Sequence, residues 1–280
     1  MRLQTIAKRE IKLGFRNSWT YTFLILLIIF TLAILLFQSG VPDAEGYTDM
    51  MGAMMNVTLY LLPLITLLLG GISTVTEKED GHWQLLSTYG LSTYLFLWGK
   101  WIGLLLILIT MIIFSFGLSG IITVIFGKDP GFSSFLFFFL FASLLAIVYL
   151  GLSIGIGAIA KNRWQALIIG IGIWFLTIVL WPTLLISFLT LLPYSSIKPT
   201  LEILTFLNPA ELVRIFSMVK LDAGSVFGPE YLQWVTWADG PFGIPVFIAI
   251  ISLWIITSIT VGGFIWKRRE IGRASCRERV

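Results

Sequence analysis

The charged and titratable side chains that could do chemistry gather in one hydrophilic stretch, residues 77–100. It opens with the carboxylates of Glu77, Glu79 and Asp80 and contains the only histidine of the chain, His82. A metal site needs several ligands at matching spacing, and a catalytic imidazole needs a nucleophile within reach. His82 has no such partners in the sequence. The stretch therefore predicts a binding surface, without a metal site or catalytic residues.

A second cluster consists of thioethers beside a carboxylate. Met50, Met51, Met54 and Met55 follow Asp49 directly. Soft sulfur ligands select Cu(I), so transient copper binding is one interpretation. The favoured alternative is that these methionines fill irregular apolar space where a membrane span begins. The sequence leaves the copper question open.

The composition shows in what kind of protein these residues must work. Of the 280 residues, 57% are hydrophobic and 12% are charged, whereas soluble domains have about 25% charged residues. Crossing a hydrocarbon core takes roughly 20 helical residues. Six apolar runs are long enough, namely residues 20–37, 57–75, 101–126, 135–160, 164–192 and 244–266. The sequence predicts an all-α membrane protein with one transmembrane domain over residues 1–269.

Residues 270–280 are expected to be foreign to the protein. They resemble the translation of a sequencing-adapter read-through, which belongs to no native fold. Cys276, the only cysteine, would then be non-native. The competing interpretation is an ordinary basic tail.

Lysine and arginine are distributed unevenly between the connections, which predicts the orientation. Residues 1–19 carry five, connections 76–100 and 161–163 two each and residues 267–269 three, whereas 38–56 has none and 127–134 one. Positive residues concentrate in cytoplasmic loops, so both termini are expected in the cytoplasm. The net charge of +4 is accordingly a signal of topology, not of nucleic-acid binding.

The six apolar runs contain no Asp, Glu, Lys, Arg or His. Ion-coupled carriers usually keep such residues at membrane depth. The sequence also lacks the G-x-x-x-x-G-K-[ST] loop that binds nucleotide phosphates. A self-powered carrier and an intramembrane enzyme are therefore disfavoured. Any energy that the chain uses is expected to come from another polypeptide.

The first residues have the pattern of an amphipathic helix that precedes span one. Leu3, Ile6, Ile11 and Phe15 approximate one face, and four basic residues occupy the others. Such a helix is expected to lie in the headgroup plane, with its cations toward anionic lipid.

The connection between spans five and six predicts short helices on the outer side. Asn208, Pro209 and Glu211 form a strong helix start, with Asn at the N-cap and Pro at the first helical position. An apolar stripe follows, formed by Leu212, Ile215, Phe216 and Val219. These helices are expected to dip into or rest on the outer leaflet, where a lid over the bundle and a substrate contact are both open interpretations.

Two features of the later spans predict how they pack. Gly151 and Gly155 have the spacing of a close helix–helix contact, and packing inside the bundle is favoured over a dimer seam. Pro182 is expected to kink span five near its outer end.

Within the hydrophilic stretch, a short helix with a ridge of large side chains is expected. Gly81 ends the preceding helix, and Trp83, Leu85 and Leu86 follow it. Such side chains suit a groove on another protein. Anchoring at the inner headgroup boundary is the alternative.

Taken together, these features resemble the permease subunits of ABC type-2 transporters. The parallels are the basic segment before span one, six spans with both ends inside, the mixed-charge run 77–80, Gly81-His82, Leu85-Leu86, Gly99-Lys100, and Asn208-Pro209-x-Glu211-x-x-Arg214. Within the family, the resemblance is greatest to the permeases that serve maturation of nitrous-oxide reductase and their relatives. The chain departs from that pattern at His82 and Gly90, where Thr and Pro are common.

The resemblance implies a non-catalytic permease without a cofactor, in a bacterial or archaeal cell membrane. It implies a homodimer or paired permease with a cytoplasmic ATPase subunit on each half. Residues 77–90 would then hold the coupling helix that docks into the ATPase. A different class of function also stays open, a membrane scaffold that uses ATPase strokes to remodel a partner on the outer face. The sequence does not identify a substrate or the direction of its transport.

Overall fold

The computed structural model describes residues 3–37, 49–125, 132–220 and 232–277, and within these ranges the chain is helical with no β-strand. The elements are α1 (Leu3–Gly14), α2 (Ser18–Phe37), α3 (Asp49–Glu79), α4 (His82–Thr88), α5 (Thr93–Ile125), α6 (Phe132–Ile159), α7 (Arg163–Trp174), the π-helical segment η2 (Phe175–Leu180), α8 (Trp181–Leu189), α9 (Tyr194–Leu207), α10 (Pro209–Lys220), α11 (Leu232–Asp239) and α12 (Gly243–Arg277).

The long helices have the length and hydropathy of membrane spans. Five stretches in the described ranges meet both criteria, namely Met54–Glu79, Thr93–Ile122, Leu136–Ile159, Arg163–Leu189 and Gly243–Arg269. The shorter apolar stretch Thr20–Ala33 in α2 adds to them. The fold class expected from the sequence, an all-α membrane protein, is confirmed.

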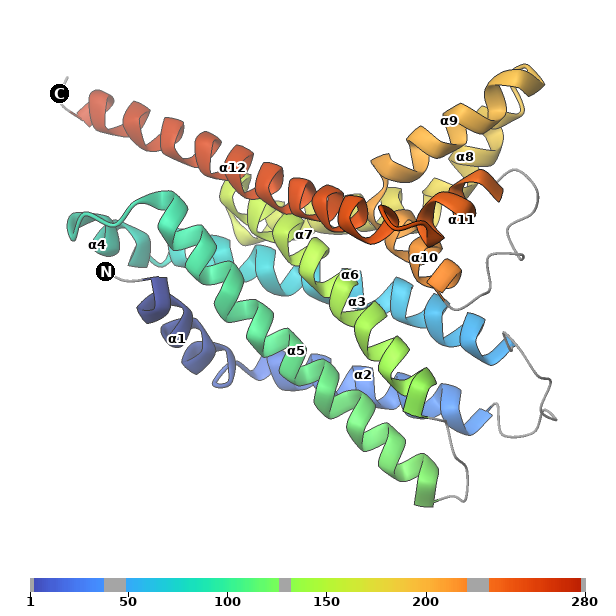
Figure 1. Cartoon of the computed structure of the whole chain (residues 1–280). Coiled ribbons are helices and arrows are strands. Elements are labelled where there is room, and N and C mark those ends of the chain that lie inside the picture. The colour runs from blue at the N-terminus through green and yellow to red at the C-terminus, as the bar shows by residue number, and fades with distance from the viewer. Residues whose placement is uncertain (1–2, 38–48, 126–131, 221–231, 278–280) are drawn as a thin grey trace.

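The helices form an elongated bundle with two different ends. Figure 1 shows α1, α4 and the last turns of α12 together at one end, and α9, α10 and α11 at the other. The first end also contains Lys161, in the short connection between α6 and α7, and Arg163, the first residue of α7, which forms ion pairs with Glu79 and Asp80. We call this the basic end and the opposite one the far end.

Helix α6 lies at the centre and packs along both α3 and α12. Glycines allow the close approach on each side. A Cβ atom on Gly157 would lie 2.8 Å from the carbonyl oxygen of Gly71 in α3, and one on Gly155 would lie 2.6 Å from that of Ser258 in α12. Gly151 likewise faces Ile255 of α12. The expectation that Gly151 and Gly155 pack inside the bundle is confirmed.

Helix α1 packs against the first half of α5. A Cβ atom on Gly99 would meet Ile6 at 2.8 Å, and one on Gly103 would meet the carbonyl oxygen of Ala7 at 2.9 Å. The buried residues of α1 are Ile6, Ala7 and Glu10. Of the predicted apolar face, only Ile6 is buried, and Phe15 is exposed. That α1 lies in the headgroup plane stays a prediction. Gly99 and Gly103 leave space on α5 in which α1 packs closely.

Span five is interrupted between α7 and α8. The six residues of η2 form a π-helix, and Pro182 follows at the start of α8. No residue of α8 is buried, and Figure 1 shows α8 and α9 diverging from the rest of the bundle. The interruption expected at Pro182 is thus a change of helix type in the six residues before Trp181.

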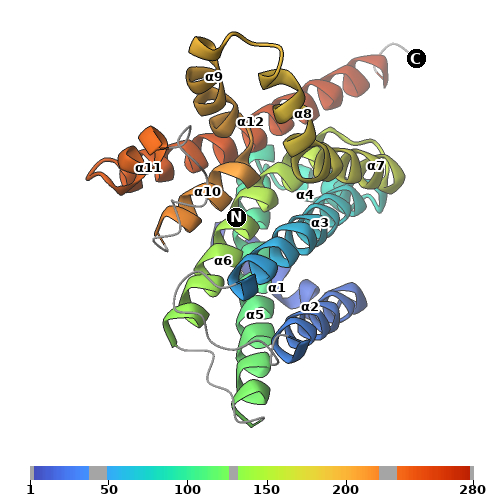
Figure 2. The ribbon, with the colours of Figure 1, turned by 90° about the vertical axis from the view of Figure 1, so that its right-hand side faces the viewer.

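At the far end, α10 is inserted into the bundle instead of resting on it. Ten of its residues are buried, including the whole predicted stripe of Leu212, Ile215, Phe216 and Val219. Figure 2, which looks at this end, shows α10 between α6 and α9, both of which it contacts. The apolar side chains of α10 are covered by protein partners on more than one side. Its position relative to the outer leaflet stays a prediction.

Candidate functional site

The hydrophilic stretch 77–100 forms a hairpin whose base is closed by a buried ion pair. Glu77, in the last turn of α3, lies 2.8 Å from the Nζ atom of Lys100 in the second turn of α5. Glu10 of α1 also lies 2.8 Å from this ammonium group, and Arg9 is 3.2 Å from Glu77. The four charges tie three helices together directly behind the hairpin.

This cluster is a finding that sequence reasoning missed. Lys100 is 0% exposed and Glu77 is 6% exposed, so Glu77 is not a solvated carboxylate as expected. The α3 helix continues past the predicted end of span two, which turns this side chain toward α1 and α5. Burial is also the main cause that raises the pKa of Glu10 above its ordinary value. Buried charges of this kind require one another as partners.

The other charges of the hairpin bind the end of α6 and the start of α7. Arg163 lies 2.6 Å from Glu79 and 2.7 Å from Asp80. Lys78 donates to the carbonyl oxygens of Ala158 and Ala160, at 2.7 and 2.9 Å, and so caps the end of α6. Glu79 and Asp80 are exposed, as expected, but their carboxylates are engaged within the chain.

Trp83 anchors α4 to the bundle. Only 3% of it is exposed, and its ring lies 4.9 Å from that of Phe96 and 5.0 Å from that of Trp266 in α12. This corrects the expectation that Trp83 belongs to an exposed ridge. In a helix as short as α4, an apolar residue can face either the bundle or the outside. Here Trp83, the largest side chain, packs inward between Phe96 of α5 and Trp266 of α12.

The outward surface of α4 carries two large apolar side chains. Leu85 is 65% exposed and Tyr89, at its C-terminal end, is 77% exposed. They are four residues apart and so lie on the same helical face. His82 is exposed beside them, and Leu86 is half-buried. We call Leu85 and Tyr89 the α4 ridge; Tyr89 was not singled out from the sequence, although its spacing from Leu85 was visible there.

Two glycines with left-handed backbone delimit this unit. Gly81 has φ 76° and precedes α4, and Gly90 has φ 73° and follows it. Residues with side chains rarely adopt these angles. The hairpin therefore turns sharply at both ends of α4, and its base and aromatic anchor hold it in place.

The described residues around the hairpin do not form a metal site. In the described ranges, no group of three or more His, Cys, Asp or Glu residues is close enough to hold a metal ion. Met54 and Met55 are both buried in apolar surroundings. The side chains of Met50 and Met51 lie outside the described residues, so copper binding by this cluster stays untested.

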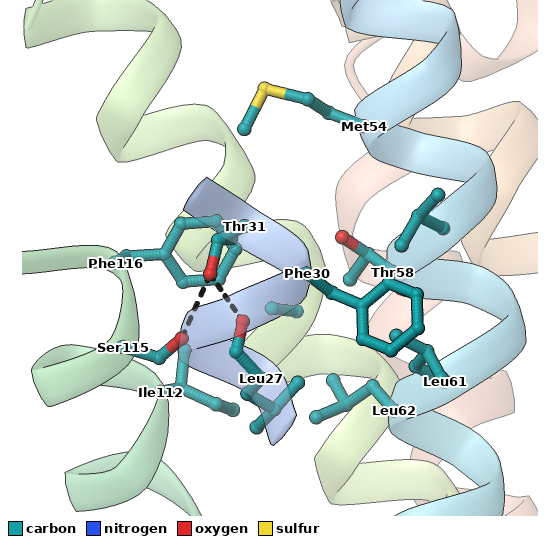
Figure 3. A pocket seen from close by; sticks show the side chains of 12 residues that line it. Leu27, Phe30, Thr31, Met54, Thr58, Leu61, Leu62, Ile112, Ser115 and Phe116 are labelled. Atoms are coloured by element: carbon teal, nitrogen blue, oxygen red, sulfur yellow. Dashed lines mark hydrogen bonds between the residues drawn. The ribbon is translucent and has the colours of Figure 1, made fainter. Parts of the chain in front are cut away.

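Met54 also lines a pocket between α2, α3 and α5 (Figure 3). The only polar side chains that line the pocket are Thr31, Thr58 and Ser115. The hydroxyl oxygens of Thr31 and Ser115 are 3.1 Å apart and form a hydrogen bond. The full lining consists of Leu27, Phe30, Thr31, Met54, Val57, Thr58, Leu61, Leu62, Ile112, Ser115, Phe116 and Ala142. The pocket has no charged group that could orient an ion.

The predicted far-end residues lie at the opposite end of the molecule from the hairpin. The side-chain oxygen of Asn208 accepts a hydrogen bond from the Ala210 amide at 3.0 Å, and Pro209 begins α10. Glu211 and Arg214 form an ion pair of 2.5 Å along the same helix. The N-cap function expected of Asn208 is confirmed.

Comparison with known proteins identifies the family. The family model described as ABC-2 family transporter protein matches residues 4–271. The chain belongs to this family.

Two relatives match over nearly their whole length. The probable ABC transporter permease protein NosY of Pseudomonas aeruginosa is 27% identical over 283 residues, covering 95% of this chain and 98% of the relative. The protein of the same name from Stutzerimonas stutzeri is 27% identical over 272 residues, covering 94% and 97%. The ABC-2 chain described here is thus a transmembrane subunit of an ABC transporter and a multi-pass membrane protein.

Proposed function

We propose that this ABC-2 subunit couples ATP hydrolysis by a separate ATPase subunit to transport across the membrane. The observation that carries the proposal is the α4 ridge. Its two side chains are among the most exposed large apolar residues of the described chain, yet they stand on a helix fixed by Trp83 and by the Glu77–Lys100 pair. A rigid apolar ridge is the kind of feature that fills a pocket on a partner protein.

The composition of the basic end supports a cytoplasmic partner. The hairpin, the α6–α7 connection and the end of α12 carry the lysines and arginines that the positive-inside rule places in the cytoplasm. Since the sequence has no phosphate-binding loop of its own, an ATPase must be supplied by another chain. We place both termini and α4 on the cytoplasmic side of a bacterial or archaeal cell membrane.

We further propose that two such subunits form one transporter, as a homodimer or a pair of related permeases. Span five exposes apolar side chains along much of its length, for example Ile168 and Ile186. These side chains are suited to lipid or to a second bundle. Each subunit of the pair would dock one ATPase at its own α4 ridge, and ATP-driven movement of the ATPases would rock the bundles.

A second candidate function is mechanical remodelling of a partner on the outer face, with nothing transported. A specific observation favours keeping it: α10 at the far end is hydrogen-bonded to span five, through Asn208 and the carbonyl oxygen of Thr177 at 2.6 Å. A movement of the bundle would therefore reach the far end. A polar path at the dimer seam would favour transport, and a sealed apolar seam would favour remodelling.

The test of the proposed function begins with the intact protein. The chain is purified in mild detergent from the cells that encode it, and the co-purifying material is assayed for ATP hydrolysis. A nucleotide-binding subunit in about equal amount supports the proposal. If no ATPase activity co-purifies with the chain under any mild detergent condition, the proposed function is contradicted.

A further inference from the structure

Span five contains a backbone carbonyl that the helix cannot satisfy by itself. In a π-helix each carbonyl oxygen bonds to the amide five residues ahead. Five residues after Thr177 is Pro182, which has no N–H. The π register of η2 therefore leaves the carbonyl oxygen of Thr177 without a backbone donor. Asn208, which lies beside this carbonyl, is 1% exposed, and an unpaired backbone carbonyl in such buried surroundings is costly.

Asn208 supplies the missing donor from a different helix. Its side-chain amide donates to the carbonyl oxygen of Thr177 at 2.6 Å, while its oxygen caps α10 at Ala210. The side chain is almost fully buried. One asparagine thus satisfies both the break in span five and the start of α10.

The same segment is held on two other sides. The Thr177 hydroxyl donates to the carbonyl oxygen of Ile173 at 2.8 Å and lies 3.0 Å from the hydroxyl of Tyr149 in α6. Trp174, the residue before η2, donates its indole N–H to the carbonyl oxygen of Tyr60 in α3 at 2.8 Å. The π segment is therefore specified by contacts with three helices.

In an ordinary α register, a different carbonyl of span five would lack a backbone donor. There each carbonyl bonds to the amide four residues ahead, so Thr177 would pair with Trp181, and Pro182 would instead leave the carbonyl of Ile178 unpaired. Asn208 would then have no free carbonyl at Thr177 to bind. Loss of the one-residue bulge would also turn α8 by about 100° relative to α7.

We propose that Asn208 is a positioning residue that selects the π register of span five, and that a shift of this segment to the α register breaks the hydrogen bond that ties the start of α10 to span five. The attachment makes α10 a reporter of the register of span five. This inference goes beyond the ATPase partnership and does not depend on it.

Spin labels on either side of η2 test the register directly. Exposed Ile168 of α7 and Ile186 of α8 are replaced by labelled cysteines in a C276S background, and the distance distribution is measured in lipid nanodiscs. The variant is Asn208→Ser, which keeps a good N-cap oxygen but is too short to reach Thr177. Asn162→Ser is the matched control, since Asn162 caps α7 at Gln165 in the same way.

The proposal expects one distance population in the parent protein and in N162S, and a second population in N208S. Amide exchange over residues 209–220 should also be at least tenfold faster in N208S than in N162S. Tyr149→Phe, which keeps the buried ring and removes only its hydroxyl, serves if N208S does not fold, and a smaller second population is expected. A parent-like single population in a folded N208S, or in Y149F where N208S fails to fold, overturns the proposal.

Discussion

Glu77 and Lys100 are 23 positions apart and form a buried ion pair of 2.8 Å across the base of the hydrophilic hairpin. Every residue of α4 lies between them. The pair holds the end of α3 next to the start of α5, which are the two segments that enter and leave the hairpin. Glu10 adds a second carboxylate from α1. The position of the α4 ridge is therefore set by charges that the sequence places on three separate helices.

Removal of the cation should destabilise the whole basic end. In Lys100→Met the carboxylates of Glu10 and Glu77 stay buried without their common partner, which costs about 3–5 kcal/mol for a broken buried pair. Thermal unfolding in detergent measures the loss. Lys161→Met, at an exposed position in the α6–α7 connection, is the control and should unfold like the parent protein. Equal stability of the two variants would show that the cluster does not hold α1 and α3 to α5.

Trp83 and Leu85 should behave differently although they are two residues apart. Trp83→Ala empties the aromatic site beside Phe96 and Trp266, and truncations of this kind cost about 3–5 kcal/mol. Leu85→Ala removes an exposed side chain and should change stability by about 0.5 kcal/mol or less. The two melting curves decide the point. A stable W83A protein would mean that α4 is not anchored by this ring.

The crossing of α6 and α12 predicts a contrast between two glycines. Gly155→Ala places a methyl group against the Ser258 carbonyl oxygen, at 2.6 Å in the present backbone, and such overpacking typically costs about 1–3 kcal/mol. Gly117→Ala in α5 meets nothing within 4 Å, so it should be neutral or stabilise by about 1 kcal/mol. Thermal unfolding of both variants checks this. Destabilisation of G117A and tolerance of G155A would reverse the assignment.

Local patterns in the sequence were enough to predict the membrane spans and the N-cap of α10. The long apolar runs predict the spans because crossing a membrane demands length and hydropathy, and both are local properties. The start of α10 is also local, since Asn208, Pro209 and Glu211 follow one another. The glycine pair in α6 predicts a close contact, although its partner Ser258 could not be named.

The contacts between distant segments could not be predicted in the same way. Lys100 and Glu10 are 90 positions apart, and no periodicity in either helix indicates the other. In a helix as short as α4, hydrophobicity alone does not say which apolar residue turns inward, so Trp83 was placed on the wrong face. Pro182 alone does not predict the π segment. The carbonyl oxygen of Thr177 lacks a backbone donor there, and its partner Asn208 lies 31 positions further along the chain.

The most direct test of the proposed function is the affinity of the co-purified ATPase subunit for variants of the α4 ridge. The paired change Leu85→Ala and Tyr89→Ala leaves Trp83 and the ion cluster intact, so the permease should fold with an unchanged melting temperature. If each side chain contributes about 1 kcal/mol or more, as anchor residues do, the paired change should weaken binding about thirtyfold or more. Leu13→Ala, at another exposed apolar position of the basic end, is the matched control and should bind like the parent protein. Undiminished binding by the L85A/Y89A protein would contradict the assignment of α4 as the docking helix.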